Sequence, residues 1–123
     1  MKHAKQKHLD ICYFGSSTGA ASALVAAGKF HISSIVVRSG RTDLVEDNLL
    51  SQVVAPCLFN VGGKEETLIK INKDAIKKLK NVEEKQLHVV SNASHLFEEE
   101  GYLEDVANIS TEWFKKHIEV PVP

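Results

Sequence analysis

Four short runs of apolar residues recur along the chain, separated by longer stretches in which apolar residues follow a helical spacing. The runs are LDICYF (9–14), HISSIVVR (31–38), VAPCLFNV (54–61) and KQLHVV (85–90). Each run is rich in β-branched or aromatic residues and ends near glycine or a small polar residue. Because the runs are continuously apolar rather than alternating, they are typical of strands buried on both faces of a parallel sheet.

Helices are predicted between these strands. The segment from Ser17 to Gly28 consists almost entirely of small, helix-forming residues, and Gly28 is expected just beyond its last turn. A shorter helix is predicted near residues 44–51, and two longer helices near 66–80 and 102–118. The alternation of strands and helices predicts an α/β fold, with a four-stranded parallel sheet, flanking helices and right-handed crossovers.

Length and composition are those of one ordinary globular domain, expected over residues 9–118 between a polar segment (1–8) and a short tail (119–123). The formal net charge of −1 gives no strong field that would recruit nucleic acid or an anionic membrane. No apolar run reaches the roughly 18 residues of a membrane span, and the first residues lack the apolar core of a signal peptide. Cys12 and Cys57 stand alone in apolar runs and predict buried thiols rather than disulfides or a metal site. We therefore expect a cytoplasmic protein without metal or other cofactor.

The segment after the first predicted strand fits G-x-S-x-G, the sharp turn that exposes a nucleophilic serine. Ser17 would carry the hydroxyl, while Gly15 and Gly19 would remove side chains that collide with the neighbouring strand and helix. The backbone N–H of Thr18 would supply one donor to an oxyanion. The alternative is a glycine-rich turn that binds an anion at a helix N-terminus, although the lysine of a P-loop and the pattern G-x-G-x-x-G are both absent.

The other predicted strands also end in residues that suit a serine hydrolase. A nucleophilic serine needs a histidine that accepts its proton and a carboxylate that orients the imidazole, in the chain order Ser, acid, His. His95 follows the fourth strand and is the candidate base. Asp43 follows the second strand, and Glu65 and Glu66 follow the third, so three carboxylates are candidates for the acid. All of these residues are expected at the edge where the carboxyl ends of the strands meet.

These segments resemble the C-terminal half of α/β-hydrolases over nearly the whole chain. The stretches that carry the resemblance are CYFGSSTGAASALVAAG, VVRSGRTDL, APCLFNVGGKEE and SNASHLFEEEGYLEDVANISTEWFKKHI. The similarity is to the dienelactone-hydrolase-like branch, which includes members fused to a phosphoribosyltransferase domain. It implies Ser17 as the nucleophile, His95 as the base and Glu65 at the acid position, where the family usually has the aspartate of G-G-x-D. Asp43, and after it Glu66, remain the alternative acids.

The resemblance also implies that the strands preceding the elbow in a complete α/β-hydrolase are missing here. A complete α/β-hydrolase has further strands before the elbow, for which this chain has no room, and that portion supplies half of the oxyanion hole. Strand 9–14 is then expected to be an apolar sheet edge that needs cover. We expect a homodimer through this strand, with a continuous eight-stranded sheet, or a partner chain that supplies the missing strands.

The activity that the resemblance implies is hydrolysis of a small carboxylic ester or lactone through an acyl-Ser17 intermediate. The alternative is a catalytically impaired hydrolase half-domain that works through assembly as a dimer or with a partner chain. A third interpretation is a binder of small anions at the start of the helix 17–28.

Overall fold

Strands and helices alternate along the part of the chain that the computed structural model describes, residues 11–95, 99 and 101–118. The elements are β1 (Cys12–Ser16), α1 (Thr18–Lys29), β2 (Ser34–Arg38), the 3-10 turn η2 (Thr42–Leu44), α2 (Asp47–Leu50), β3 (Cys57–Gly62), α3 (Glu66–Lys78), β4 (Lys85–Val90) and α4 (Tyr102–Lys116). The segments 1–8 and 119–123, expected as a polar start and a tail, lie outside the described residues.

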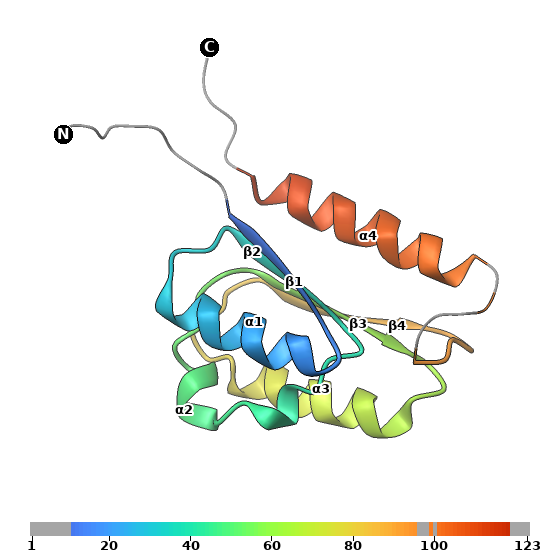
Figure 1. The fold of residues 1–123 in the computed structure, drawn as a ribbon, viewed down its shortest axis with the longest axis horizontal. Coiled ribbons are helices and arrows are strands. Elements are labelled where there is room, and N and C mark those ends of the chain that lie inside the picture. Colours follow the sequence, from blue (N-terminus) through green and yellow to red (C-terminus); the bar gives the residue numbers. More distant parts are fainter. Residues whose placement is uncertain (1–10, 96–98, 100, 119–123) are drawn as a thin grey trace, which may run out of the picture.

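The four strands form one parallel sheet in the order β1-β2-β3-β4. At the carboxyl ends of the first three strands, Ser16 lies beside Arg38 and Arg38 beside Asn60. The strand arrows in Figure 1 all point towards the same edge. The predicted α/β fold with a four-stranded parallel sheet is confirmed, and the loops that carry the candidate site residues leave from that edge.

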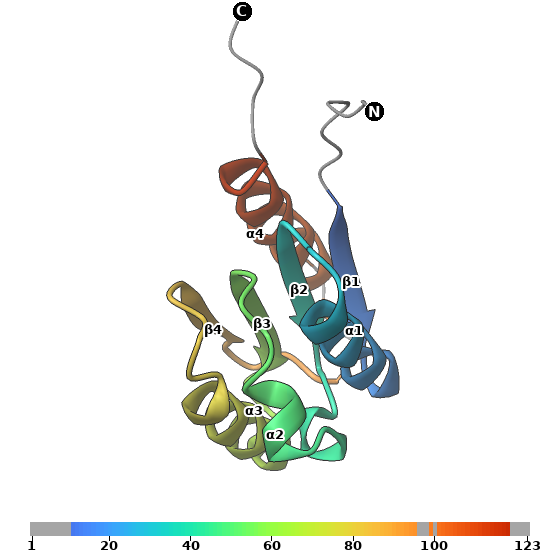
Figure 2. The ribbon, with the colours of Figure 1, turned by 90° about the vertical axis from the view of Figure 1, so that its left-hand side faces the viewer.

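The described helices cover the two faces of the sheet unequally. α1, α2 and α3 pack on one face, whereas α4 lies on the other (Figures 1 and 2). The larger core lies between the sheet and α1–α3, and its most deeply buried side chains include Leu24, Ile35, Val37, Leu50, Phe59 and Leu79. On the opposite face, Val36 and Leu58 pack against Trp113 of α4.

The predicted strands 9–14, 31–38 and 54–61 each begin three residues before β1, β2 and β3, whereas the first helix agrees to within one residue at each end. What differs in that helix is the role of Gly28. Gly28 lies inside α1 rather than after it, and the N–H of Phe30 closes the helix on the carbonyl of Ala26 at 3.0 Å. A Cβ at Gly28 would lie 3.1 Å from the Cβ of Gln52, just after α2. The glycine therefore serves the close packing of α1 against the end of α2 and does not end the helix.

Both cysteines are free thiols. Cys57 is fully buried in β3, and burial raises the pKa of its thiol to about 12. Cys12 at the start of β1 is half-buried and accepts a hydrogen bond from the Ser34 hydroxyl at 3.4 Å. None of the helices in the described ranges has the length and apolar character needed to span a membrane.

Candidate active site

Ser17 alone links the end of β1 to the start of α1. Its backbone has φ 52° and ψ −120°, a region that a residue with a side chain enters only at a cost of about 1–3 kcal/mol. Neighbouring backbone holds this conformation: the Ser17 N–H donates to the carbonyl of Arg38 at 3.1 Å, and the Ser17 carbonyl accepts from the N–H groups of Arg41 (2.9 Å) and Ala20 (3.2 Å). The turn therefore holds the serine in a strained conformation at the carboxyl edge of the sheet.

The two glycines of the turn differ in what they do. A Cβ at Gly15 would lie 2.7 Å from the Cα of Ala20 and 2.8 Å from the carbonyl oxygen of Gly19, so only glycine lets α1 fold back onto β1. Apart from its chain neighbours and the backbone of its own helix, a Cβ at Gly19 would meet no heavy atom of the described residues within 4 Å. The crowding expected at Gly19 is therefore not found, and that part of the prediction is wrong.

The structure brings the hydroxyl of Ser17, the imidazole of His95 and the carboxylate of Glu65 together. The Ser17 Oγ lies 2.8 Å from the His95 Nε2, a hydrogen-bond distance between residues 78 positions apart. On the other side of the ring, the His95 Nδ1 lies 3.6 Å from the Glu65 Oε1. That separation is longer than a hydrogen bond, as is common for catalytic groups before substrate binds. The order hydroxyl, imidazole, carboxylate is the one that a serine nucleophile requires.

Two loops, one after β3 and one after β4, bring Glu65 and His95 together because they are in direct backbone contact. A Cβ at Gly62 would lie 2.4 Å from the carbonyl oxygen of Ala93, so no larger residue fits there. The N–H of Lys64 donates to the same carbonyl at 3.0 Å. The Gly-Gly step at the end of β3 thus allows the acid-bearing loop to lie against the histidine-bearing loop.

Further side chains hold the histidine loop, and the sequence reasoning missed them. The Ser39 hydroxyl donates to the carbonyl of His95 at 2.7 Å. Glu99 accepts from the Ser94 N–H (3.1 Å) and hydroxyl (3.3 Å), and the Lys64 ammonium lies 3.5 Å from its other oxygen. The Ser94 N–H holds the pKa of the Glu99 carboxyl below its usual value. The position of Ser39 after the second strand could have indicated its role, whereas nothing distinguishes Glu99 within the run of three glutamates.

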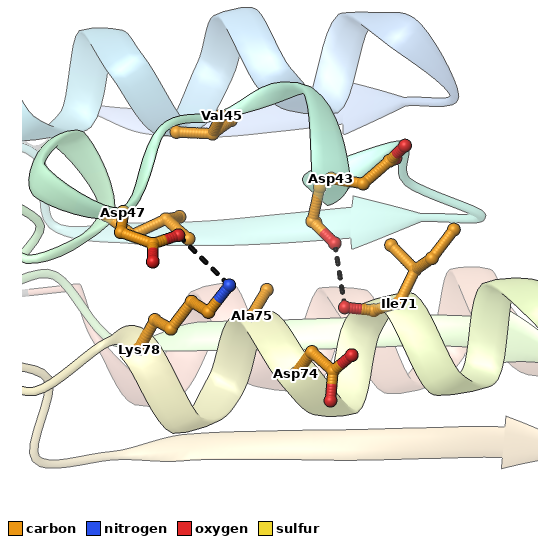
Figure 3. A pocket seen from close by; sticks show the side chains of 9 residues that line it. Asp43, Val45, Asp47, Ile71, Asp74, Ala75 and Lys78 are labelled. Carbon is orange, nitrogen blue, oxygen red and sulfur yellow. Dashed lines mark hydrogen bonds and ion pairs between the residues drawn. The ribbon is translucent and has the colours of Figure 1, made fainter.

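The alternative acids lie elsewhere. Both oxygens of Asp43 accept hydrogen bonds from the Arg41 guanidinium, each at 2.9 Å, and this pairing lowers the pKa of Asp43. Asp43 lines a small cavity of about 150 Å³ between the η2–α2 segment and α3, near the ion pair of Asp47 with Lys78 (Figure 3). Glu66 is the first residue of α3. Within the described ranges, Glu65 is the carboxylate recorded beside the imidazole.

The start of α1 provides the hydrogen-bond donors nearest in sequence to the nucleophile. The N–H groups of Thr18 and Gly19 belong to the first turn, which has no intrahelical acceptors, and the positive end of the helix dipole lies there. Free N–H groups at a helix N-terminus favour an anion at that position. In the part of the chain that the structure describes, no group of three or more His, Cys, Asp or Glu residues could hold a metal ion.

Comparison with known proteins places this geometry in context. No family model matches the chain. The crystal structure of dienelactone hydrolase from Anabaena variabilis ATCC 29413 superposes with a TM-score of 0.84 at 40% identity, over 95% of this chain and 54% of that one. Two proteins from Mycobacterium tuberculosis strains CDC 1551 / Oshkosh and H37Rv, provisionally named phosphoribosyl transferases, are each 44% identical over 117 residues. Those residues are 94% of this chain and 26% of each relative. The chain thus spans about a quarter of the curated relatives it matches and about half of the solved structure.

Proposed function

We propose that this chain, a partial α/β-hydrolase of the dienelactone-hydrolase-like kind, is a serine hydrolase that cleaves a small carboxylic ester or lactone. One observation carries the proposal: the Ser17 hydroxyl lies on a backbone turn with positive φ and is 2.8 Å from the His95 Nε2. A hydroxyl in that position can lose its proton to the imidazole as it attacks a carbonyl carbon.

The proposed reaction has two halves. In the first, the Ser17 oxygen bonds to the substrate carbonyl carbon while His95 Nε2 takes the hydroxyl proton, and the carbonyl oxygen becomes an oxyanion near the Thr18 N–H. The bond to the leaving alkoxide then breaks, and the alkoxide takes the proton from His95. In the second half, water attacks the acyl-Ser17 ester with His95 again as the base, and the acid product leaves with Ser17 restored. With a lactone, the released hydroxyl stays attached to the acyl chain.

Glu65 has the role of stabilising the charged intermediate state of the histidine. When His95 holds the transferred proton, its Nδ1–H faces the Glu65 carboxylate, and the present separation of 3.6 Å shortens as the ion pair forms. Glutamate serves as the acid in this fold class as well as aspartate does. Because both side chains are partly exposed, the attraction is smaller than it would be in a closed site.

A second candidate function is a non-catalytic unit within a larger assembly. The names of the curated relatives support it, since they point to phosphoribosyl transfer, and so does their length, since this chain spans 26% of each. In that case the site would be a remnant, and its geometry would serve only the packing of the loops.

A fluorophosphonate probe separates the two candidates. We expect covalent labelling of the folded chain at Ser17, located by peptide mass spectrometry, and complete loss of labelling in Ser17→Ala. Ser16→Ala is the matched control, because Ser16 is the adjacent hydroxyl and its Oγ contacts Arg38 rather than His95. A chain that is folded by circular dichroism but unlabelled at Ser17 would overturn the hydrolase proposal and favour the non-catalytic unit.

A further inference from the structure

The loop after β2, residues 39–42, contacts both the serine and the histidine of the candidate site. The N–H of Arg41 donates to the carbonyl of Ser17 at 2.9 Å, and the Ser39 hydroxyl donates to the carbonyl of His95 at 2.7 Å. Ser39 itself has φ 50°, a conformation that a residue with a side chain seldom adopts. One short loop therefore holds the backbone of two residues that lie 78 positions apart in the sequence.

Close packing and a backbone hydrogen bond fix the start of this loop on the sheet. A Cβ at Gly40 would lie 2.3 Å from the Cγ1 of Val37 and 2.7 Å from the Cβ of Ala20, so the loop lies directly against β2 and α1. The N–H of Ser39 donates to the carbonyl of Asn60 in β3 at 2.7 Å. The rest of the loop is held from the side of α3.

A buried asparagine of α3 binds the loop from that side. Asn72 is fully buried, and its Nδ2 donates to the Gly40 carbonyl at 3.1 Å and to the Leu68 carbonyl at 2.8 Å. A reversed amide would turn its oxygen towards two carbonyl oxygens, so the neighbours decide the direction of the group. The Thr42 hydroxyl donates to the Ile71 carbonyl at 3.3 Å, which is the dashed line that ends at Ile71 in Figure 3. Adjacent residues of α3 thus hold the loop at Gly40 and at Thr42.

Asn72 occupies a position where the pattern of the helix favours an apolar residue. It lies in the buried stripe of α3 together with Leu68 and Ala75. Its Oδ1 is buried and accepts no hydrogen bond from the described residues, a cost that an apolar side chain at this position would avoid. The stability of the core alone therefore does not account for an amide here, whereas the hydrogen bond to Gly40 does.

The helix that carries Asn72 also carries the candidate acid. Glu65 is the N-cap of α3, and the N–H of Ile69 donates to its carbonyl at 3.0 Å, so the acid is fixed to the helix. Asn72 lies about two turns further along. Its hydrogen bond to Gly40 joins α3 to the loop that holds the serine and the histidine. The separation of 3.6 Å between His95 Nδ1 and Glu65 Oε1 therefore depends on this connection.

We propose that Asn72 is a positioning residue of the proposed hydrolase, which aligns Glu65 with His95 by binding α3 to the loop 39–42. It acts through the backbone of Gly40 and touches no reacting atom. Without the hydrogen bond, the loop and the acid can shift relative to each other, and a shift of about 1 Å can cost about 10²-fold in rate. The positioning role rests on the proposed function, whereas the connection between α3 and the loop does not.

Two substitutions of Asn72 test the role. Asn72→Ala removes the amide and keeps a good helix former, and Asn72→Ser keeps a donor near Leu68 but leaves the Gly40 carbonyl unbound. Fluorophosphonate labelling of Ser17, measured per chain that is folded by circular dichroism, should be about tenfold slower in both variants. An unchanged labelling rate in either folded variant would overturn the positioning role. Failure of both variants to fold would also overturn it, because the amide would then serve the fold itself.

Two control variants separate positioning from stability. Asp47→Asn removes the exposed ion pair with Lys78 at 3.0 Å, which also joins the segment after β2 to α3. Leu79→Ala lowers the stability of the fold by shortening a buried side chain about two turns beyond Asn72. Both should be labelled, per folded chain, at the rate of the unchanged chain. Slowing in Leu79→Ala equal to that in Asn72→Ala would overturn the proposal.

Limited digestion with trypsin tests the connection without any need for catalytic activity. Cleavage after Arg41 requires the loop to open locally, and cleavage after Lys29 at the end of α1 is the reference in the same sample. We expect the ratio of the two cleavage rates to rise about fivefold in Asn72→Ala and to stay constant in Asp47→Asn. An unchanged ratio in Asn72→Ala would overturn the connection. A raised ratio in a chain whose unchanged form is never labelled would overturn the hydrolase function and leave the connection standing.

Discussion

The elbow that carries Ser17 and the loop that carries His95 meet at one edge of the sheet, but different interactions hold them. The elbow is fixed by backbone hydrogen bonds and by the close packing of the α1 backbone against Gly15. The histidine loop depends on side chains from other strand ends, Ser39 and Glu99 among them. Ser17 is therefore placed by local backbone geometry, whereas His95 is placed by long-range contacts that single substitutions can remove. Four predictions test that difference, in order of decreasing effect.

The largest effect is expected at Glu65, the carboxylate beside the His95 imidazole. Glu65→Gln should slow fluorophosphonate labelling of Ser17 by about 10²–10³-fold, because the charged imidazole loses its carboxylate and the amide can favour the wrong tautomer. Asp43→Asn is the control, since Asp43 pairs with Arg41. Labelling rates of the two variants give the comparison. A slower rate in Asp43→Asn with no change in Glu65→Gln would move the acid to the loop after β2.

The next largest effect is expected at the elbow, where a substitution should lower the stability of the fold. Gly15→Ala places a Cβ within 2.8 Å of the backbone of α1, so the helix must shift. We expect a loss of about 2–3 kcal/mol in the free energy of unfolding, measured by urea denaturation. Gly19→Ala, with open space around its Cβ, should change it by no more than about 1 kcal/mol, in the stabilising direction that alanine has in helices. Equal losses in both variants would contradict the difference in space around the two glycines.

A smaller effect is expected from the hydroxyl that holds the histidine backbone. Ser39→Ala removes the 2.7 Å hydrogen bond to the His95 carbonyl, worth about 1 kcal/mol. Because the bond holds the backbone of His95, fluorophosphonate labelling should slow by about fivefold while the fold is retained. Ser51→Ala removes a similar hydroxyl-to-carbonyl bond, at 2.8 Å to Asn48 of α2, away from the site. It should leave the labelling rate unchanged, and a matching decrease there would show that the effect of Ser39 is only on stability.

The smallest effect concerns pH. The pKa of Glu99 is lowered in the folded chain, chiefly by the Ser94 N–H, so its contribution to stability is present above the unfolded pKa of about 4.3. That contribution is lost as the pH falls through the lowered folded pKa. Glu99→Gln should therefore weaken the decline in unfolding free energy below about pH 4.3. Asp43 and Glu84 have pKa values lowered in the same direction, so part of the decline remains.

Exposed Glu83 offers a control for that measurement. Glu83→Gln changes the same charge at a residue outside the two loops, and denaturation of both variants between about pH 3 and pH 7 isolates the part that belongs to Glu99. A steeper decline in Glu99→Gln than in the unchanged chain would contradict a lowered pKa for Glu99 in the folded state.

Local patterns in the sequence predicted the fold and the elbow. The apolar runs predicted the four strands because buried parallel strands are apolar throughout, and G-x-S-x-G predicted the turn because its strain lies within five residues. The pattern could not predict how much space surrounds each glycine, because that depends on residues distant in the sequence. Gly28 was expected to end a helix but instead touches Gln52, and Gly19 was expected to be crowded but is open.

The position of a carboxylate after a strand likewise does not tell which carboxylate lies beside His95. Asp43 and Glu65 both follow strands, so their sequence positions are equivalent as far as the sheet edge is concerned. What separates them is a neighbour: Arg41 binds Asp43 through both oxygens, while Glu65 lies beside His95. Such pairings depend on how loops fold back, which a single sequence does not encode in any regular spacing.

The backbone hydrogen bond between the loops after β3 and β4 makes opening of the histidine loop measurable. The amide proton of Lys64 is bound to the Ala93 carbonyl, two residues before the histidine. Any excursion that carries the imidazole away from the serine by opening that loop must release this proton to solvent. Its exchange rate in deuterated water, read from one resonance, would therefore give the fraction of time that His95 spends away from Ser17.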